Sequence, residues 1–358
     1  MREMLNRGSG IAIALLLAIV ASSIVMLLSH INPIASYGAL LSGAAGSSQG
    51  LAETLAQTST LLFAGLGVGL ALRAGLFNIG AEGQLILGGL CAAVVGAAVH
   101  LPLLLEIPLC LIAGAFAGGV WAGAAGWLRA QFGASEIITT IMLNYIAIYG
   151  SDYLVNGPLR GSPTIPETAA IAHTAVLSPL IADTRLTLAF PLAVIAAVAV
   201  AWWLGRTVPG YELRAVGKSE RAARYAGIDV KQTLVRAMIA SGALAGLGGA
   251  TEVMGLTHHF NASLSPGYGF TAIAVALLAG SNPIATIASA TLFGALQNGA
   301  LAMQALAGAP KDVVSIVQGF VILFVAANWF GRFVRVRGAA AMLAPEAETT
   351  TTVAEGAG

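Results

Sequence analysis

The chain has 358 residues, of which 57% are hydrophobic and only 9% charged, and its mean hydropathy is +0.85. A soluble domain carries about 25% charged residues, so this composition excludes an ordinary soluble protein. The formal net charge of +1 gives no sign of a nucleic-acid partner. Long apolar runs recur along the chain without the period-two alternation of a membrane β-barrel. We therefore expect an all-α protein, a polytopic membrane helical bundle.

About ten segments are candidate membrane spans. They cover residues 11–30, 51–72, 79–99, 103–128, 137–157, 187–205, 237–257, 266–281, 284–304 and 313–331. The first is too long for the apolar core of a signal peptide, so we expect it to be retained. With both termini cytoplasmic, the 17 basic residues fall on the inner side except for Arg160, Arg185 and Lys311. The positive-inside rule predicts this asymmetry.

These spans are expected to form a single transmembrane domain over residues 1–337. Its largest external loop is residues 158–186, in which several prolines limit regular structure. Its largest internal loop is residues 206–236. Residues 338–358 are rich in Ala, Thr and Glu and have no apolar period, so we expect a disordered cytoplasmic tail.

The eighth span is the weakest. A PGYG sequence precedes it and GSNP ends it, which leaves only residues 270–279 as uninterrupted helix. That is half of the roughly 20 residues that a crossing needs, so we expect a short or broken helix. The sequence leaves open whether residues 266–281 cross the membrane. Elsewhere, glycines four residues apart, as at Gly114 with Gly118 and Gly242 with Gly246, predict close helix packing.

A polar octapeptide, FNIGAEGQ at residues 77–84, interrupts two apolar stretches. Amides and carboxylates at membrane depth are costly unless they face protein or water, so Asn78, Glu82 and Gln84 are candidates for a translocation pathway or gate. The topology makes Asn78 a candidate N-cap of the third helix, with Glu82 near the positive end of its dipole. An inner gate or a brace at a helix start is therefore the preferred interpretation of the octapeptide. It accounts for Asn78 and Glu82 better than for Gln84.

A polar stripe runs along the fifth span. Glu136, Thr140 and Asn144 recur at i, i+4 and i+8 on an otherwise apolar helix, so they share one face. This face must turn toward the bundle interior or toward water. Two interpretations stay open, since the stripe would serve equally to line a translocation path or to form a hydrogen-bonded seam between helices.

The internal loop contains a candidate short helix at residues 219–225, with Ser219 as its N-cap and Gly227 as its stop. Its basic side chains suit contact with anionic lipid or docking of a cytosolic protein, and composition alone favours lipid. The GKS sequence at residues 217–219 is not a phosphate loop, because Glu212 stands where that motif needs glycine. We therefore expect no ATP binding by that route.

The other ionisable residues give weaker evidence about function. Three acidic residues lie near external span ends, where we expect them to reach water: Glu53, Glu106 and Glu252. His258 and His259 suit an interfacial pair, and we predict no metal site. An intramembrane hydrolase is disfavoured because Ser241 has no base nearby. An ion-driven secondary transporter remains an alternative.

Four blocks of the chain resemble a known family. They are residues 77–84, the SEIITTIMLNY block at residues 135–145, the internal segment 214–228 and the region 270–283. Together they are similar to permease subunits of bacterial ABC uptake systems, in the nucleoside branch of the ribose and branched-chain amino-acid permease group. The resemblance covers about residues 50–330.

The resemblance implies a multi-pass permease of the bacterial plasma (inner) membrane, not an enzyme, which forms a pathway for nucleosides. Simple sugars and branched-chain amino acids are alternatives within the same superfamily. The implied partners are a homologous second permease, a cytosolic ABC ATPase that binds ATP and Mg²⁺, an extracytoplasmic substrate-binding lipoprotein and membrane lipid, while this chain holds no cofactor. The internal loop becomes the ATPase-coupling loop, through Arg214, Gly217, Lys218, Glu220, Arg221, Arg224, Tyr225 and Gly227.

Overall fold

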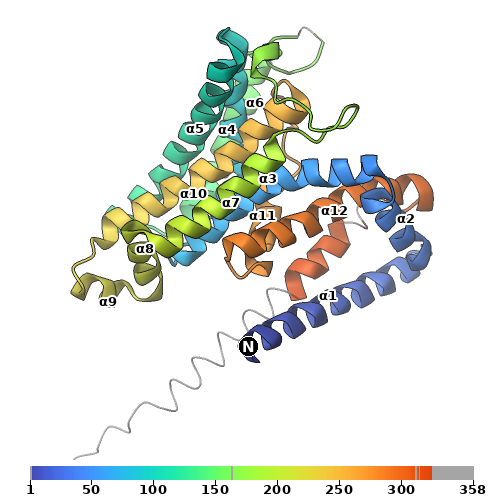
Figure 1. Cartoon of the computed structure of the whole chain (residues 1–358), viewed down its shortest axis with the longest axis horizontal. Helices are drawn as coiled ribbons and strands as arrows, with labels where there is room; N and C mark the ends of the chain where they lie inside the picture. The colour runs from blue at the N-terminus through green and yellow to red at the C-terminus, as the bar shows by residue number, and fades with distance from the viewer. Residues whose placement is uncertain (1, 163, 311–312, 314, 325–358) are drawn as a thin grey trace, which may run out of the picture.

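The computed structural model of the chain describes residues 2–162, 164–310, 313 and 315–324 (Figure 1). Within this part the chain is built of helices and loops, and β pairing is limited to two isolated bridges, Glu167 with Asn261 and Pro179 with Thr187. The prediction of an all-α fold is confirmed. The tail predicted at residues 338–358 lies outside the described residues.

Most of the α-helices are joined by short loops and turns. In chain order they are α1 (Arg2–Leu28), α2 (Pro33–Ala45), α3 (Ser48–Arg73), α4 (Ala81–Ala98), α5 (Leu103–Phe132), α6 (Glu136–Asn156), α7 (Ala189–Arg206), α8 (Val208–Lys218), α9 (Glu220–Tyr225), α10 (Val230–Glu252), α11 (Tyr268–Leu278) and α12 (Pro283–Ala307). A 3₁₀ turn at His173–Ala175 lies in the loop before α7, and a π-helical turn, Val253–Thr257, extends α10.

Six of the described helices are long and apolar enough to cross a membrane, namely α3, α4, α5, α7, α12 and α10 with its π turn. The described chain also holds shorter apolar helices at Leu16–Leu28, Tyr268–Leu278 and Ser315–Phe324. These findings support a multi-pass membrane protein. The count of about ten crossings and the cytoplasmic position of both termini stay predictions.

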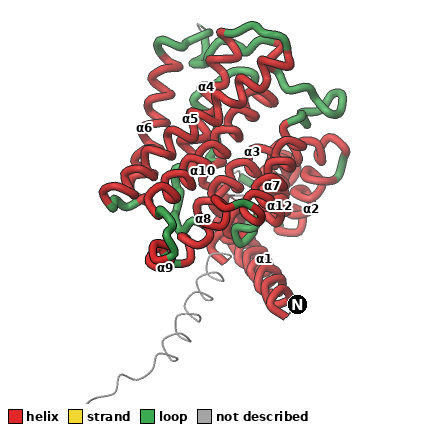
Figure 2. Tube along the Cα trace, turned by 60° about the vertical axis from the view of Figure 1, so that its left-hand side comes forward, coloured by secondary structure: helices red, strands yellow, loops and turns green. Residues whose placement is uncertain are grey.

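α10 is the central helix of the bundle. It packs on α3, α4 and α5, and it runs between α5 and α7 in Figure 1. A Cβ on Gly118 of α5 would overlap the carbonyl oxygen of Gly242, and one on Gly246 would overlap that of Gly114. The backbones of α5 and α10 are therefore in contact, as the glycine spacing predicts. Figure 2 shows α8 and α9 at one end of the bundle and long loops at the opposite end.

α2 and α12 begin with the same four residues, NPIA. Asn32 and Asn282 cap these helices by accepting hydrogen bonds from the next backbone N–H groups, and a proline occupies the first turn of each helix. The two helices pack together. Asn298 of α12 then donates to the carbonyl oxygens of Gly43 and Gly50, at 3.2 and 2.8 Å, which fixes the turn between α2 and α3.

The expected eighth span is α11, whose 11 residues confirm the prediction of a short helix. The internal loop predicted over residues 206–236 is mostly helical instead. Thr207 caps α8, and Pro209 lies in the first turn, where its fixed φ suits a helix start. Ser219 caps α9 and Gly227 follows it at φ +82°, as predicted. α10 begins at Val230 rather than near position 237, because Asp229 caps it.

Candidate functional site

Five predicted polar residues are buried around the start of α4, where Asn78, Gln84 and Asn144 form a network of hydrogen bonds with one another and with the neighbouring backbone. The five residues are at most 3% exposed: Asn78, Glu82, Gln84, Thr140 and Asn144. The side-chain amides of Asn78 and Gln84 pair reciprocally, at 2.9 Å from Asn78 Nδ2 to Gln84 Oε1 and 3.0 Å from Gln84 Nε2 to Asn78 Oδ1. Asn78 Nδ2 also donates to the hydroxyl of Ser241 on α10, at 2.9 Å. This pairing gives Gln84 a hydrogen-bond partner, which the sequence did not predict.

The polar stripe of α6 faces this network. Asn144 Oδ1 accepts from the backbone N–H of Gly83 at 2.8 Å, and Asn144 Nδ2 donates to the carbonyl oxygen of Ile79 at 2.8 Å. The hydroxyl of Thr140 donates within its own helix, to the carbonyl oxygen of Glu136 at 2.7 Å. Of the two bonds made by Asn144, one ends in the first turn of α4, and the other ends on the connection just before that helix. The geometry is that of a hydrogen-bonded seam, one of the two interpretations left open above.

Glu82 braces the start of α11, whereas the sequence predicted that it would support the start of its own helix, α4. α4 begins at Ala81 with Gly80 as its N-cap, so Asn78 is not the cap, and its Oδ1 instead accepts from the Gly80 N–H at 2.9 Å. Glu82 Oε2 accepts from the backbone N–H of Gly269, in the first turn of α11, at 2.7 Å. A carboxylate at this position satisfies an otherwise unpaired amide and favours the positive end of the helix.

The network bonds to the end of the non-helical backbone that joins α3 to α4, a connection in which Gly75 is exposed. Ala74, Leu76 and Asn78 in this connection are at most 2% exposed. Non-helical backbone at membrane depth is tolerated only where protein or a water-filled cavity surrounds it. In this connection the side chains of Asn78 and Asn144 pair with the backbone groups. The network thus stabilises a break between two membrane helices.

A second buried polar cluster, which the sequence did not indicate, lies toward the opposite end of α10. Glu252 is 4% exposed and accepts from the hydroxyl of Thr60 at 2.5 Å. The hydroxyl of Tyr268 donates to Gln57 Oε1 at 3.0 Å. The residues come from α3, α10 and α11, and no local pattern in the chain brings those three helices together.

The expectation that Glu106 and Glu252 reach water is wrong, because both are buried. Glu106 accepts from the backbone N–H of Leu101 and from the hydroxyl of Thr174, so the loop before α7 covers it. Beyond the π turn, burial lowers the pKa of His258 below its ordinary value, and the neighbouring histidine and Arg185 add to this effect. This shift favours the neutral form of the His258 imidazole.

α8 and α9 carry the predicted coupling residues. α8 is packed on the bundle through Leu213 and Val216, both 2% exposed. Gly217 lies so close to the end of α3 that a Cβ there would overlap the carbonyl oxygen of Arg73. Arg214 donates along its own helix to the carbonyl oxygen of Gly210, at 3.3 Å, and Lys218 is the last residue of α8.

α9, in contrast, is a surface element. Its side chains line a surface pocket of about 390 Å³, formed by Glu220, Arg221, Arg224 and Tyr225. Tyr225 is 86% exposed. Neither Arg221 nor Arg224 has a hydrogen-bond or ion-pair partner within the described residues. Glu220 does have one, since its Oε1 lies 3.9 Å from Arg129 Nη2. α9 therefore presents two free cations and an exposed aromatic ring.

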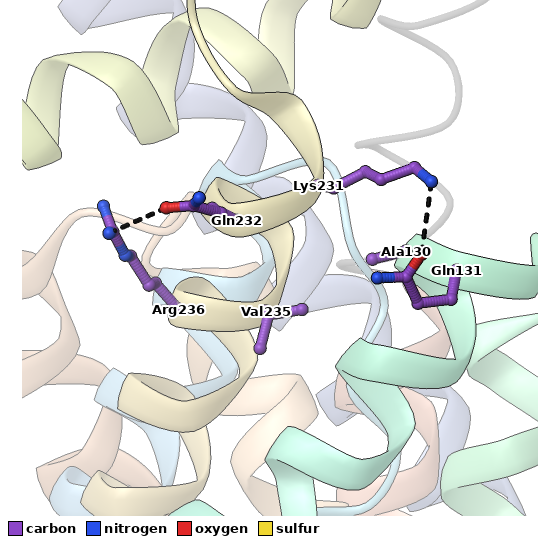
Figure 3. A pocket seen from close by; sticks show the side chains of 6 residues that line it. All are labelled: Ala130, Gln131, Lys231, Gln232, Val235 and Arg236. Carbon is purple, nitrogen blue, oxygen red and sulfur yellow. Dashed lines mark hydrogen bonds between the residues drawn. The ribbon is translucent and has the colours of Figure 1, made fainter.

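A second pocket, of about 200 Å³, lies near the start of α10 and the end of α5 (Figure 3). Its cations are paired with side-chain amides. Lys231 Nζ donates to Gln131 Oε1 at 3.2 Å, and Arg236 Nη2 donates to Gln232 Oε1 at 2.9 Å. Like α9, this pocket carries two cations, but here both are paired, which makes it a natural control surface.

Fold and sites together define a multi-pass helical membrane protein with a polar brace inside the bundle and an exposed basic helix at one end. The chain belongs to the family described as branched-chain amino acid transport system / permease component, whose model matches residues 50–326. It is thus a transport component of an ABC system, and not an enzyme. ATPase and substrate-binding partners belong to such systems.

Three relatives cover most of the chain. It is 39% identical to the guanosine ABC transporter permease NupP of Bacillus subtilis, over 90% of this chain and 94% of that protein. It is 36% identical to the nucleoside ABC transporter permease NupB of Lactococcus lactis, over 88% and 90%. It is 35% identical to the glucose ABC transporter permease TsgB13 of Haloferax volcanii, over 90% and 88%. No solved structure matches the chain significantly.

Proposed function

We propose that the chain is a permease subunit of an ABC importer for nucleosides and forms part of their translocation pathway. The observation that carries this proposal is the 39% identity to a guanosine permease along 94% of that protein. A second relative, named for nucleosides, supports it at 36% identity. The glucose permease at 35% identity makes simple sugars the alternative substrate, and the family description retains branched-chain amino acids.

The proposed arrangement is about ten crossings of a bacterial plasma membrane, with both termini and the α9 end of the bundle in the cytoplasm. The basic residues of α8, α9 and the start of α10 support this orientation, since positive charge collects on the cytoplasmic side. The loops at the opposite end then face the outside, where an extracytoplasmic binding lipoprotein delivers the substrate.

In this arrangement a cytosolic ATPase docks on α9, and ATP and Mg²⁺ bind to that partner. Arg221, Arg224 and Tyr225 suit the docking surface because they are exposed and, for the two arginines, unpaired within the described chain. A homologous second permease completes the pathway, which runs between the two permease subunits. The ion-driven transporter and the hydrolase considered above lose their support, because the chain is an ABC permease.

The contacts suggest how motion at α9 reaches the bundle. α8 joins α9 and presses Gly217 against Arg73 at the end of α3. The connection that follows Arg73 leads into the buried network around Asn78 and Glu82, which holds the starts of α4 and α11. A shift of the ATPase would thus tilt α8, displace this connection and move two helix starts. In this mechanism the network is a rigid brace that carries the shift to the two helices.

The test is uptake by the complete importer, with this permease, its second permease, its ATPase and its binding protein, in proteoliposomes. We expect ATP-dependent uptake of labelled guanosine or uridine, and uptake of glucose and leucine no faster than in liposomes without the complex. Transport of glucose but not of nucleosides would support the sugar alternative. Uptake by this chain alone, driven by an ion gradient, would contradict the ABC mechanism.

A further inference from the structure

α6 has two faces, and only one of them is used inside the chain. Thr140, Asn144 and Ser151 point into the bundle, where each is at most 2% exposed. The opposite face carries tyrosines at i, i+4 and i+8, which are 52%, 68% and 72% exposed: Tyr145, Tyr149 and Tyr153. Figure 2 shows α6 at the edge of the bundle, so this face is open to whatever lies beside the subunit.

The tyrosine face differs from the exposed middle parts of α5 and α7. α5 exposes Ile112, Phe116 and Val120, and α7 exposes Ile195 and Val198, none of which carries a polar atom in its side chain. Those faces suit lipid. None of the three tyrosine hydroxyls on α6 has a hydrogen-bond partner in the described part of the chain. In hydrocarbon such hydroxyls would stay unsatisfied, at a cost in free energy.

An aromatic belt at the membrane interface does not account for this face. α6 has 21 residues and is about 31 Å long at 1.5 Å per residue, and Tyr145 lies one residue from its middle. Belt tyrosines gather at the two ends of a span. Tyr153 suits such a belt, but Tyr145 lies near the middle of the predicted span 137–157, away from both of its ends. The two rings of Tyr145 and Tyr149 lie nearly parallel, with centroids 6.2 Å apart and an interplanar angle of 18°.

We propose that this face of α6 lines the substrate pathway and that Tyr145 and Tyr149 stack on the nucleobase as it passes. The proposal rests on the nucleoside importer proposed above. A pathway between two permeases is lined by surfaces that each subunit leaves exposed, which is true of this face and not of the buried network. Stacking on an aromatic ring accepts purines and pyrimidines alike, because every base has a π-face.

The rest of the face fits the same occupant. Asp152 and Asn156 lie beyond the tyrosines toward the outer end of α6, with Asn156 Nδ2 bonded to Asp152 Oδ1 at 2.9 Å. A carboxylate accepts hydrogen bonds from hydroxyls such as those of ribose, and a side-chain amide both accepts from them and donates to them. Toward the inner end, Ile138 and Met142 are exposed and apolar. The pathway would therefore be polar and aromatic at its outer half and dry at its inner half.

The experiment compares three variants of the complete importer in proteoliposomes. The double variant Tyr145→Ala/Tyr149→Ala should lower the initial rate of nucleoside uptake about tenfold or more, the size expected from losing aromatic stacking on a base. Tyr145→Phe/Tyr149→Phe keeps both rings and should stay within about twofold of the wild type. Phe116→Ala removes an exposed ring from the apolar face of α5 and should transport normally.

A photoreactive azido-purine nucleoside provides a direct readout. With ATPase turnover in progress, we expect it to label the α6 peptide that contains Tyr145 and Tyr149, and excess unlabelled guanosine should prevent this labelling. Normal uptake by the double alanine variant would overturn the assignment of this face. Loss of the second permease from the purified double alanine variant would also overturn it, by marking the face as a subunit contact. A wild-type importer that takes up no nucleoside at all would overturn the proposed function as well.

Discussion

The buried network around Asn78 and the surface helix α9 both stand out in the sequence as polar residues in an apolar chain, yet the structure uses them in opposite ways. In the network, Asn78, Gln84 and Asn144 direct their amide groups at partners within the chain. On α9, Arg221 and Arg224 have no such partners within the described residues. A polar group that is satisfied internally stabilises the fold, whereas an unsatisfied exposed one is available to another molecule.

This comparison separates two kinds of variant. Changes in the network should reduce the stability of the isolated subunit, and transport would fall only as a consequence. Changes on α9 should leave the subunit folded and act on its association with the ATPase. The distinction would be weakened if a network variant changed association with the ATPase, or if an α9 variant changed the stability of the subunit.

The largest effect is expected from Asn144→Leu. This change leaves the Gly83 N–H and the Ile79 carbonyl without their partner, and each orphaned buried group costs about 1–3 kcal/mol. We expect a lower midpoint of thermal unfolding in detergent and less monodisperse protein. Gln304→Leu is the control, because Gln304 is an exposed amide on α12, away from the network. A stable Asn144→Leu variant that cannot transport would instead assign Asn144 to the pathway.

The next effect concerns the ATPase. In Arg221→Glu/Arg224→Glu the charge of the docking surface is reversed, so we expect at least about tenfold less ATPase to co-purify with an otherwise stable permease. Lys231→Glu/Arg236→Glu makes the same change of charge in the pocket of Figure 3 and should leave the complex intact. Equal loss in both double variants would mean that net charge at this end of the bundle, and not α9, holds the partner.

Local signals in the sequence were sufficient for several of these features. The short α11 follows from the glycines and prolines around it, and α9 follows from its cap at Ser219 and its stop at Gly227. α8 and α2 also begin with a capping residue, Thr207 or Asn32, and a proline in the first turn, but neither helix was among the predicted elements. A proline in the first turn starts a helix, so both could have been predicted.

Other features depend on which helices meet, and no short stretch of sequence encodes that. The FNIGAEGQ motif marks Glu82 as unusual, but its partner Gly269 belongs to α11, far along the chain. The contact of Glu252 with Thr60 and the bonds from Asn298 to the turn before α3 are of the same kind. The two interpretations of the α6 stripe could be compared only once Ile79 and Gly83 were found opposite Asn144.

A smaller effect is expected at Gly217, which connects the two regions. In Gly217→Ala the added methyl group would overlap the carbonyl oxygen of Arg73, so α8 must move away from the end of α3. We expect the ATPase to remain bound while substrate-stimulated ATP hydrolysis falls severalfold. Gly205→Ala is the matched control, since a Cβ there meets nothing within 4 Å. Loss of the ATPase from the complex would show that Gly217 shapes the docking surface itself.

The smallest effect is expected at Glu82, where two variants distinguish the role of its charge from that of its hydrogen bond. Gln at this position keeps an oxygen that can accept from the Gly269 N–H, so Glu82→Gln should lose less than about 1 kcal/mol of stability and retain transport. Glu82→Ala removes the acceptor from the start of α11 and should cost about 1–3 kcal/mol. The measurement is thermal unfolding together with nucleoside uptake for both variants. A stable but inactive Glu82→Gln protein would require the negative charge itself in transport, and Glu82 would then belong with the functional groups rather than with the brace.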